Sequence, residues 1–164
     1  MVDRASIGAK GEPFELVIER GKVREFARAV GSTDASYLRA EQPPIPPTFL
    51  TTMFFWEREV PGSNPWDRVK LDQQRGMHAE QEYVFHGPPP RAGTRLVCQS
   101  RIEDVYEKEG RRGGTLGFAV MVTEFRDETG RLVAAATRTG VETARAPEGN
   151  VGAGREDERK TGGG

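Results

Sequence analysis

The sequence is poor in the residues that build disulfides, metal clusters and membrane spans. Of its 164 residues, one is a cysteine, Cys98, and two are histidines, His78 and His86. A single cysteine excludes an internal disulfide and a cysteine-based cluster, and two histidines leave little for a histidine-rich site, so we expect no metal. No apolar run is long enough to cross a bilayer and no signal-peptide pattern is visible, which predicts a cytoplasmic protein with no membrane partner.

Basic residues are not in excess either, and they are spread along the chain. The 24 Lys and Arg residues are balanced by 25 Asp and Glu residues, for a net charge of −1. We therefore expect no nucleic-acid partner, because phosphate binding needs a concentrated basic surface. Large apolar residues are scarce at both ends, so we predict a flexible N-terminus over 1–11, one folded domain over 12–145 and a disordered Gly-rich, charged tail over 146–164.

The remaining pattern predicts strands and two helices. Residues 12–19 alternate apolar and acidic side chains, as a short strand does. Residues 20–30 form an amphipathic helix that stops at Gly31, and residues 47–60 form a helix that is apolar on nearly all sides and therefore buried. Four long strands follow, at 78–86, 95–108, 116–125 and 132–144. The predicted fold class is α+β, with a long buried helix wrapped by a curved antiparallel sheet of about five strands.

Three stretches carry narrower expectations. Residues 61–77 break the periodicity and form either a flap or a plain surface loop, in which Trp66 is a candidate for an exposed contact. The small side chains of 132–140 leave room for a bulky neighbour, either the buried helix or a second subunit. Within 116–125, alternation places four apolar side chains on one face of a strand: Leu116, Phe118, Val120 and Val122.

Four blocks of sequence resemble the N-terminal-type, non-catalytic half of MaoC-like acyl dehydratases. In order, they are "PFELVIERGKVREFARAVGSTDASY", "PPTFLTT", "HAEQEYVFHGPPPRAGTRL" and "TGRLVAAATRTGVET", and the resemblance covers roughly residues 7–145. It implies a single hot-dog fold and the reversible addition of water to a trans-2-enoyl thioester, which gives an (R)-3-hydroxyacyl thioester. It also implies no bound cofactor, since the substrate itself carries CoA or acyl carrier protein, and a catalytic MaoC-like hot-dog subunit as partner.

The catalytic half of that family carries an aspartate and a histidine in a loop of the form G-D-x-N-P-x-H after the first helix. The corresponding loop here is "GSTDASY". Gly31 matches, but Ser32 stands at the aspartate position, Asp34 at the asparagine position and Tyr37 at the histidine position. The resemblance therefore implies that this chain has no confident catalytic residue and that the partner supplies the Asp/His pair.

Several chemically capable residues have an ordinary structural explanation. Asp34 acts as a base only if the register slips, and we expect a turn or cap residue. Tyr37 is expected to be packed or hydrogen-bonded, because an unperturbed phenol is a poor acid near neutral pH. Cys98 is expected to be a buried, inert thiol. On a regular strand, His78 and His86 share a face but lie roughly 26 Å apart, too far to share a metal or a proton.

For substrate binding, the resemblance favours the apolar helix. Phe49 occupies the position where the catalytic half has a glycine, so its side chain is expected to fill the space that a thioester enters. Met53 and Trp56 are candidates for lining an acyl channel. The substrate-binding residues that we predict are Thr48, Phe49, Met53 and Trp56.

The leading interpretation is a non-catalytic, substrate-channel subunit of a heteromeric (R)-specific enoyl-CoA or enoyl-ACP hydratase, that is, a 3-hydroxyacyl-thioester dehydratase. Two alternatives remain open. One is a hot-dog acyl-CoA thioesterase, which needs an acid facing the thioester, either Asp34 or a glutamate. The other is an acyl-CoA-binding module with no catalytic role.

Overall fold

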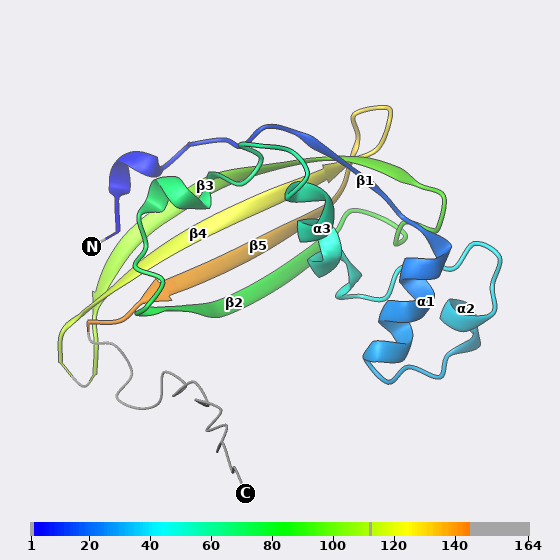
Figure 1. Ribbon diagram of the computed structural model, residues 1–164, viewed down its shortest axis with the longest axis horizontal. Helices are drawn as coiled ribbons and strands as arrows, with labels where there is room; N and C mark the ends of the chain where they lie inside the picture. Colours follow the sequence, from blue (N-terminus) through cyan, green and yellow to red (C-terminus); the bar gives the residue numbers. More distant parts are fainter. Residues whose placement is uncertain (1, 112, 145–164) are drawn as a thin grey trace, which may run out of the picture.

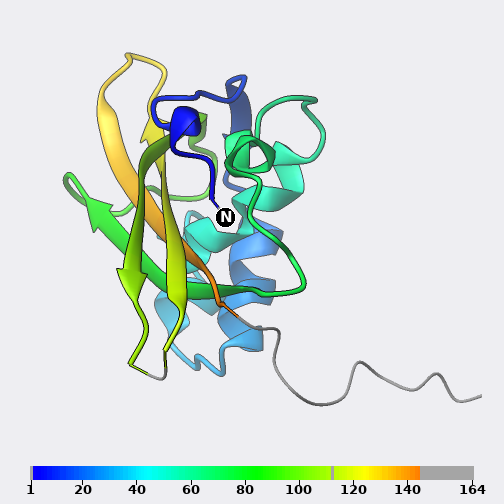
Figure 2. The ribbon, with the colours of Figure 1, turned by 90° about the vertical axis from the view of Figure 1, so that its left-hand side faces the viewer.

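The computed structural model describes residues 2–111 and 113–144 (Figure 1). Its strands are β1 (Phe14–Val17), β2 (Gly76–Phe85), β3 (Arg95–Glu109), β4 (Thr115–Arg126) and β5 (Leu132–Glu142). Its α-helices are α1 (Arg20–Ala29), α2 (Ala35–Leu38) and α3 (Phe54–Glu57), and its 3-10 helices are η1 (Arg4–Ser6), η2 (Phe49–Met53) and η3 (Pro65–Val69). All helices lie on one face of a curved sheet (Figure 2). This is the α+β hot-dog arrangement that the sequence predicts.

The sheet has the order β1-β3-β4-β5-β2, and all of its strand pairs are antiparallel. The long strands β3, β4 and β5 follow one another through tight turns. In the β4–β5 turn, Gly130 adopts φ +84°, a left-handed conformation that glycine adopts without strain. The last strand in the order, β2, precedes β3 in the chain, so the chain crosses the sheet between them.

The alternation in β4 is present, but the buried face is not the one with the largest side chains. Ala119, Met121 and Phe125 point into the core and are almost fully buried. The four apolar residues expected on one face do share it, and that face is the half-exposed outer one: Leu116, Phe118, Val120 and Val122. On this outer face, the Phe118 ring stacks on Tyr106 with centroids 4.9 Å apart.

The central helix is shorter than the long buried helix that we expected. The segment begins as η2 and becomes α-helical only over α3. Phe49, Leu50 and Met53 are buried against the sheet, whereas Phe54 and Phe55 are 36% and 50% exposed. The prolines at 46 and 47 hold the preceding chain extended, and the β-branched pair Thr51–Thr52 disfavours a regular helix, so the α-helical part is a single turn.

Phe49 belongs to the main core. Its ring packs edge-on against Phe26 of α1, with the ring centroids 5.5 Å apart. Around this pair lie apolar side chains from β1, β3, β4 and β5, including Leu16, Leu96 and Phe125. The amphipathic helix predicted for residues 20–30 thus forms, and it covers the end of the sheet beside the central segment (Figure 1).

Residues 2–11 make backbone hydrogen bonds to the sheet, although their composition led us to expect a flexible N-terminus over 1–11. Gly8 N donates to Ile102 O at 2.8 Å, and Gly11 N donates to Ser100 O at 2.9 Å, so the segment runs along β3. Val2 is buried, and its methyl groups lie 3.0–3.1 Å from where a Cβ on Gly117 would be. Backbone pairing and one apolar anchor fix a segment whose composition alone indicates disorder. The tail predicted over 146–164 lies outside the described residues.

The chain after α3 folds back onto the sheet. In η3, Val69 is fully buried and Trp66 is half-buried. A Cβ on Gly140 would lie 2.5 Å from Trp66 Cζ2, so Trp66 fills the space beside this end of β5. Farther along the strand, Ala134 and Ala136 belong to the same core as Phe49 and Leu50, so the central helical segment takes the rest of the space, as one of the two expectations had it. Across the part of the chain that the structure describes, no helix has both the length and the apolar character needed to span a membrane.

Candidate functional site

A cavity of about 880 Å³ lies between the central helical segment and strand β2 of the sheet. One wall comes from η2, α3 and the residues that follow α3. The opposite wall comes from β2 and from Arg138 of β5. The lining residues include four apolar ones, Met53, Phe54, Val60 and Pro61, and a larger polar set: Thr48, Thr51, Glu57, Arg58, Ser63, Asn64, Asp67, His78, Gln81, Tyr83 and Arg138.

Glu57 is the buried acid of this cavity. It is the last residue of α3 and is 4% exposed. Its Oε2 accepts a hydrogen bond from Asn64 Nδ2 at 3.1 Å, and Oε1 lies 3.5 Å from Ser100 Oγ. Burial raises the pKa of the Glu57 carboxyl, and the charge of Arg138 and these two hydrogen bonds oppose that rise. The result is a carboxyl that is easier to protonate than an exposed one.

A polar network continues from Glu57 into the sheet. Ser63 Oγ donates to the Glu57 carbonyl at 2.6 Å. On the strand side, Ser100 of β3 and Thr123 of β4 share a hydrogen bond of 2.8 Å between their hydroxyls. These side chains are buried, so the helix end and the two central strands are joined by satisfied polar contacts in an otherwise apolar core.

Arg138 provides the positive charge opposite Glu57. Its guanidinium carbon lies 4.7 Å from the centre of the Trp66 ring, a cation–π contact that holds the side chain over η3. Burial lowers the pKa of the Arg138 guanidinium, and the Glu57 charge acts in the opposite direction. Asn64, His78 and Arg138 also line a second cavity of about 350 Å³ beside Trp66, so the two cavities adjoin at these polar residues.

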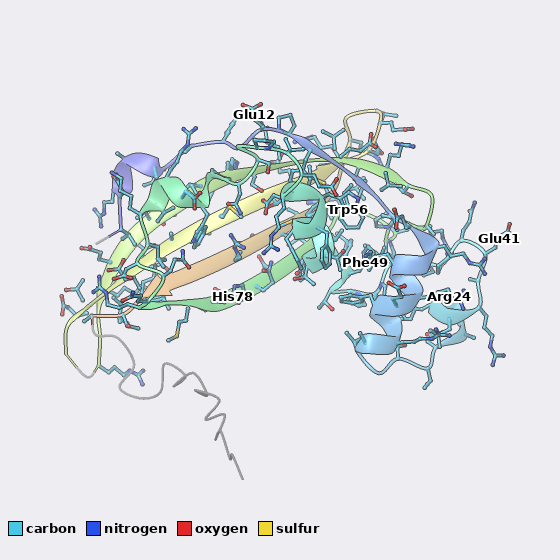
Figure 3. All side chains as sticks on the ribbon, viewed as in Figure 1. Glu12, Arg24, Glu41, Phe49, Trp56 and His78 are labelled. Carbon is cyan, nitrogen blue, oxygen red and sulfur yellow. The ribbon has the colours of Figure 1, made fainter. Side chains whose placement is uncertain are left out.

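Strand β2 contributes the rim. A β-bulge between His78 and Glu80 interrupts the pairing with β5, and it brings His78, Gln81 and Tyr83 to the cavity side. The bulge corrects the expectation that His78 and His86 share one face, because that expectation assumes a regular strand. Figure 3 shows His78 on β2, away from Phe49 and Trp56 beside the helices. Burial raises the pKa of the Tyr83 phenol, and a side-chain hydrogen bond with Thr51 acts in the opposite direction.

The four predicted substrate-binding residues divide into two pairs. Thr48 and Met53 line the cavity. Phe49 and Trp56 are not among its lining residues: Phe49 is fully buried in the core, and Trp56 packs against the same core. The two that reach the cavity are thus at the start and the middle of the central segment.

The residues of the "GSTDASY" loop lie elsewhere. Asp34 caps α2, where its Oδ1 accepts from Ser36 N at 2.7 Å, and this bond lowers the pKa of its carboxyl. Ser32 Oγ accepts from Asp34 N at 3.3 Å. Neither of them, nor Tyr37, lines either cavity. The cap role expected for Asp34 is confirmed.

Two further expectations concern cysteine and metals. Cys98 is fully buried, and burial raises the pKa of its thiol, as expected of an inert side chain. Among residues 2–111 and 113–144, no group of three or more His, Cys, Asp or Glu side chains is arranged to hold a metal ion.

Sequence reasoning did not identify Glu57, Asn64 and Arg138. One signal was available: Glu57 follows Met53 by four residues, which places both on the same side of a helix. Asn64 and Arg138 carry no comparable signal, because a loop and the last strand bring them to Glu57 only in the folded chain.

Comparison with known proteins extends these observations. A UPF0336 protein of Streptomyces griseus is 33% identical over 144 residues, which are 82% of this chain and 91% of that protein. Among solved structures, one chain of the C-terminally truncated HadBC (3R-hydroxyacyl-ACP dehydratase) complex of Mycobacterium tuberculosis superimposes with a TM-score of 0.61 at 24% identity. The superposition covers 83% of this chain and 96% of that one.

Two other structures give the same fold. A MaoC-like dehydratase superimposes with a TM-score of 0.67 at 21% identity, over 85% of this chain and 42% of that one. A chain of the ChsH1–ChsH2 complex of Mycobacterium tuberculosis superimposes with a TM-score of 0.65 at 13% identity, over 94% of this chain and 93% of that one. The family described as "FAS1-like, dehydratase domain region" matches residues 5–136. The chain is therefore a hot-dog protein that belongs to the FAS1-like dehydratase-region family.

Proposed function

We propose that this chain is the substrate-binding, non-catalytic subunit of a heteromeric (R)-specific enoyl-thioester hydratase, with a second hot-dog subunit supplying the catalytic aspartate and histidine. The observation that carries the proposal is the state of the loop after α1. Ser32 and Tyr37 stand at the two catalytic positions, Asp34 is an exposed helix cap, and none of the three lines either of the two cavities described above.

The open edge of β2 supports a hot-dog partner. In the described part of the chain, β2 pairs with β5 alone, and most of its residues are exposed, including Met77 at 52% and Val84 at 41%. An unpaired edge strand of ten residues is a template for strand addition. The same strand forms the cavity rim, so a subunit added there stands next to the substrate. HadBC and ChsH1–ChsH2 are complexes of this fold.

The cavity suits the acyl part of a thioester. A volume of about 880 Å³ is within the usual range for small-molecule sites. In the proposed complex, this subunit binds and orients the acyl group, and it keeps bulk water from the reacting C2–C3 bond. The partner's acid and base then add water across that bond or remove it. CoA or acyl carrier protein enters with the substrate, so the reaction draws on no separate cofactor.

Assays of the chain alone and in its complex test this proposal. The purified chain is expected to hydrate crotonyl-CoA and longer enoyl-CoA substrates at no more than background rate. Adding a hot-dog subunit with an intact G-D-x-N-P-x-H loop restores hydration. Robust hydration by the chain alone would overturn the non-catalytic assignment.

One observation favours a second candidate, an acyl-CoA thioesterase. Glu57 is an acid on the central helical segment, it lines the cavity, and its pKa is raised by burial, as suits a group that accepts a proton near neutral pH. Thiol release from acyl-CoA substrates by the chain alone, abolished by Glu57→Gln, would support the thioesterase. Absence of thiol release would exclude it.

A further inference from the structure

The cavity of about 880 Å³ differs from a site built for a plain fatty chain, because two oppositely charged side chains line it together with its apolar residues. Glu57, on the helix side, and Arg138, on the strand side, both face the space, and each influences the other's pKa. A hydrocarbon that filled the cavity would displace the water around both groups and offer neither of them a hydrogen bond, which is unfavourable.

Glu57 and Arg138 have capacity left for a ligand. A carboxylate accepts about four hydrogen bonds, and that of Glu57 accepts one from Asn64 and has a long contact with Ser100. Arg138 is held by its stacking on Trp66, and among the described residues its guanidinium makes no hydrogen bond or ion pair. Acceptor and donor positions therefore face the same space.

The charges select a neutral polar ligand group. A ligand carboxylate would pair with Arg138 but would be repelled by Glu57. A ligand ammonium group would pair with Glu57 but would be repelled by Arg138. A hydroxyl both donates and accepts a hydrogen bond, so it satisfies both side chains at once. The apolar residues Met53, Phe54 and Val60 remain available for the methylene groups beside it.

We propose that the cavity recognises a hydroxylated acyl chain, with the hydroxyl placed between Glu57 and Arg138. Arg138 lines both cavities, so the acyl chain can continue past the hydroxyl toward Trp66. The inference rests on the proposed function, since it names the class of acyl thioester that the subunit binds. The hydroxyl in question is remote from the thioester and is not the 3-hydroxyl that the reaction itself creates.

Calorimetric titration of the full chain with matched CoA thioesters tests this proposal. The probes are butanoyl-, hexanoyl- and octanoyl-CoA, each compared with its ω-hydroxy analogue, and octanedioyl-CoA as the charged comparison. At the chain length that reaches Glu57 and Arg138, the hydroxylated probe is expected to bind about tenfold more tightly than the plain one, as one hydrogen bond to a charged group allows. Plain chains that bind equally well or better at every length would overturn the proposal.

Two variants assign the effect to residues. Arg138→Met is expected to reduce the preference for the hydroxyl to less than about threefold, whereas the control Arg95→Met, on the far side of the sheet beside Glu15, keeps it. Glu57→Gln removes the repulsion and is expected to strengthen octanedioyl-CoA binding. If both cavity variants behave as the wild type does, the assignment is wrong. The wild-type titration decides the main claim even where a variant does not fold.

The outcomes also separate this inference from the proposed function. Hydratase activity of the complex with a preference for plain chains would contradict the inference and leave the proposed function intact. A preference for hydroxylated probes in a protein that supports no hydratase activity would support the inference and contradict the proposed function.

Discussion

At the scale of single residues, Glu57 has the most unusual environment. It is an acid at the end of a helix, 4% exposed, and the positive charge that lowers its pKa most belongs to Arg138 on β5. Since its pKa is raised in the folded chain, the folded state binds this proton more readily than the unfolded state does. The contribution of Glu57 to stability is therefore greatest below its ordinary pKa of 4.5 and is lost as pH rises through the folded pKa.

This linkage predicts the behaviour of Glu57→Gln. The amide is neutral at every pH and keeps an acceptor for Asn64, so it lacks the cost of a buried charge. The free energy of unfolding of the variant minus that of the wild type is expected to be larger at pH 7 than at pH 4. Urea unfolding of both proteins at the two pH values measures the difference. A stability difference that is the same at both pH values would show that Glu57 has no raised pKa.

Asp34 shows the opposite behaviour, because its carboxylate is exposed and accepts a backbone hydrogen bond. Asp34→Ala removes the cap of α2 and is expected to lower the melting temperature by about 2–4 °C. Asp34→Asn keeps a capping acceptor and is the matched control, with little change expected. Since the pKa of Asp34 is lowered, the difference between wild type and Asp34→Ala is present above its ordinary pKa and is lost as pH falls through the folded pKa. A larger effect of Asn than of Ala would contradict the cap assignment.

At the scale of elements, the long strands and α1 could be predicted from alternation and helical spacing, since these patterns report burial directly. The identity of the buried face of β4 could not. Both faces carry apolar residues, and the small side chain of Ala119 is buried while Phe118 is half-exposed. The choice depends on which face the helices cover, which is a tertiary fact.

The cavity shows the same limit. Thr48 and Met53 could be predicted, because they lie on an element whose role the family resemblance implies. The presence of Asn64 and Arg138 in the cavity could not be predicted, because it depends on how the aperiodic loop after α3 packs on β5. The bulge at His78 also has no signature in the sequence, and it decides which side chains of β2 reach the cavity.

The exposed edge of β2 leads to a prediction about assembly. Side chains on adjacent strands contact one another, so charge introduced on β2 interferes with a partner strand. The double variant Met77→Lys/Val84→Lys is expected to weaken association with the catalytic subunit at least about tenfold, with the fold retained. The control is Val97→Lys on β3, an equally exposed valine of an inner strand. Analytical ultracentrifugation measures association, and equal loss in both variants would show that β2 is not the interface.

At the scale of the whole molecule, the cavity and the exposed edge of β2 lie beside each other, and Ser32, Asp34 and Tyr37 of the loop after α1 line neither of the two cavities. The N-terminal segment runs along β3, on the side of the sheet away from β2. The open side is therefore the one that β2 borders. In the proposed function, a subunit that joins there completes both the sheet and the site, and activity is a property of the pair.

The most direct test of this account is hydration of an enoyl-CoA by the complex, with the loop after α1 altered in one subunit at a time. Ser32→Ala/Asp34→Asn/Tyr37→Phe in this chain is expected to leave kcat within about twofold of the wild type. Replacing the aspartate and histidine of the partner's loop by asparagine and glutamine is expected to lower kcat by a factor of about 10² or more. If the triple variant of this chain abolishes hydration while the altered partner remains active, the catalytic groups lie here and the central claim is wrong.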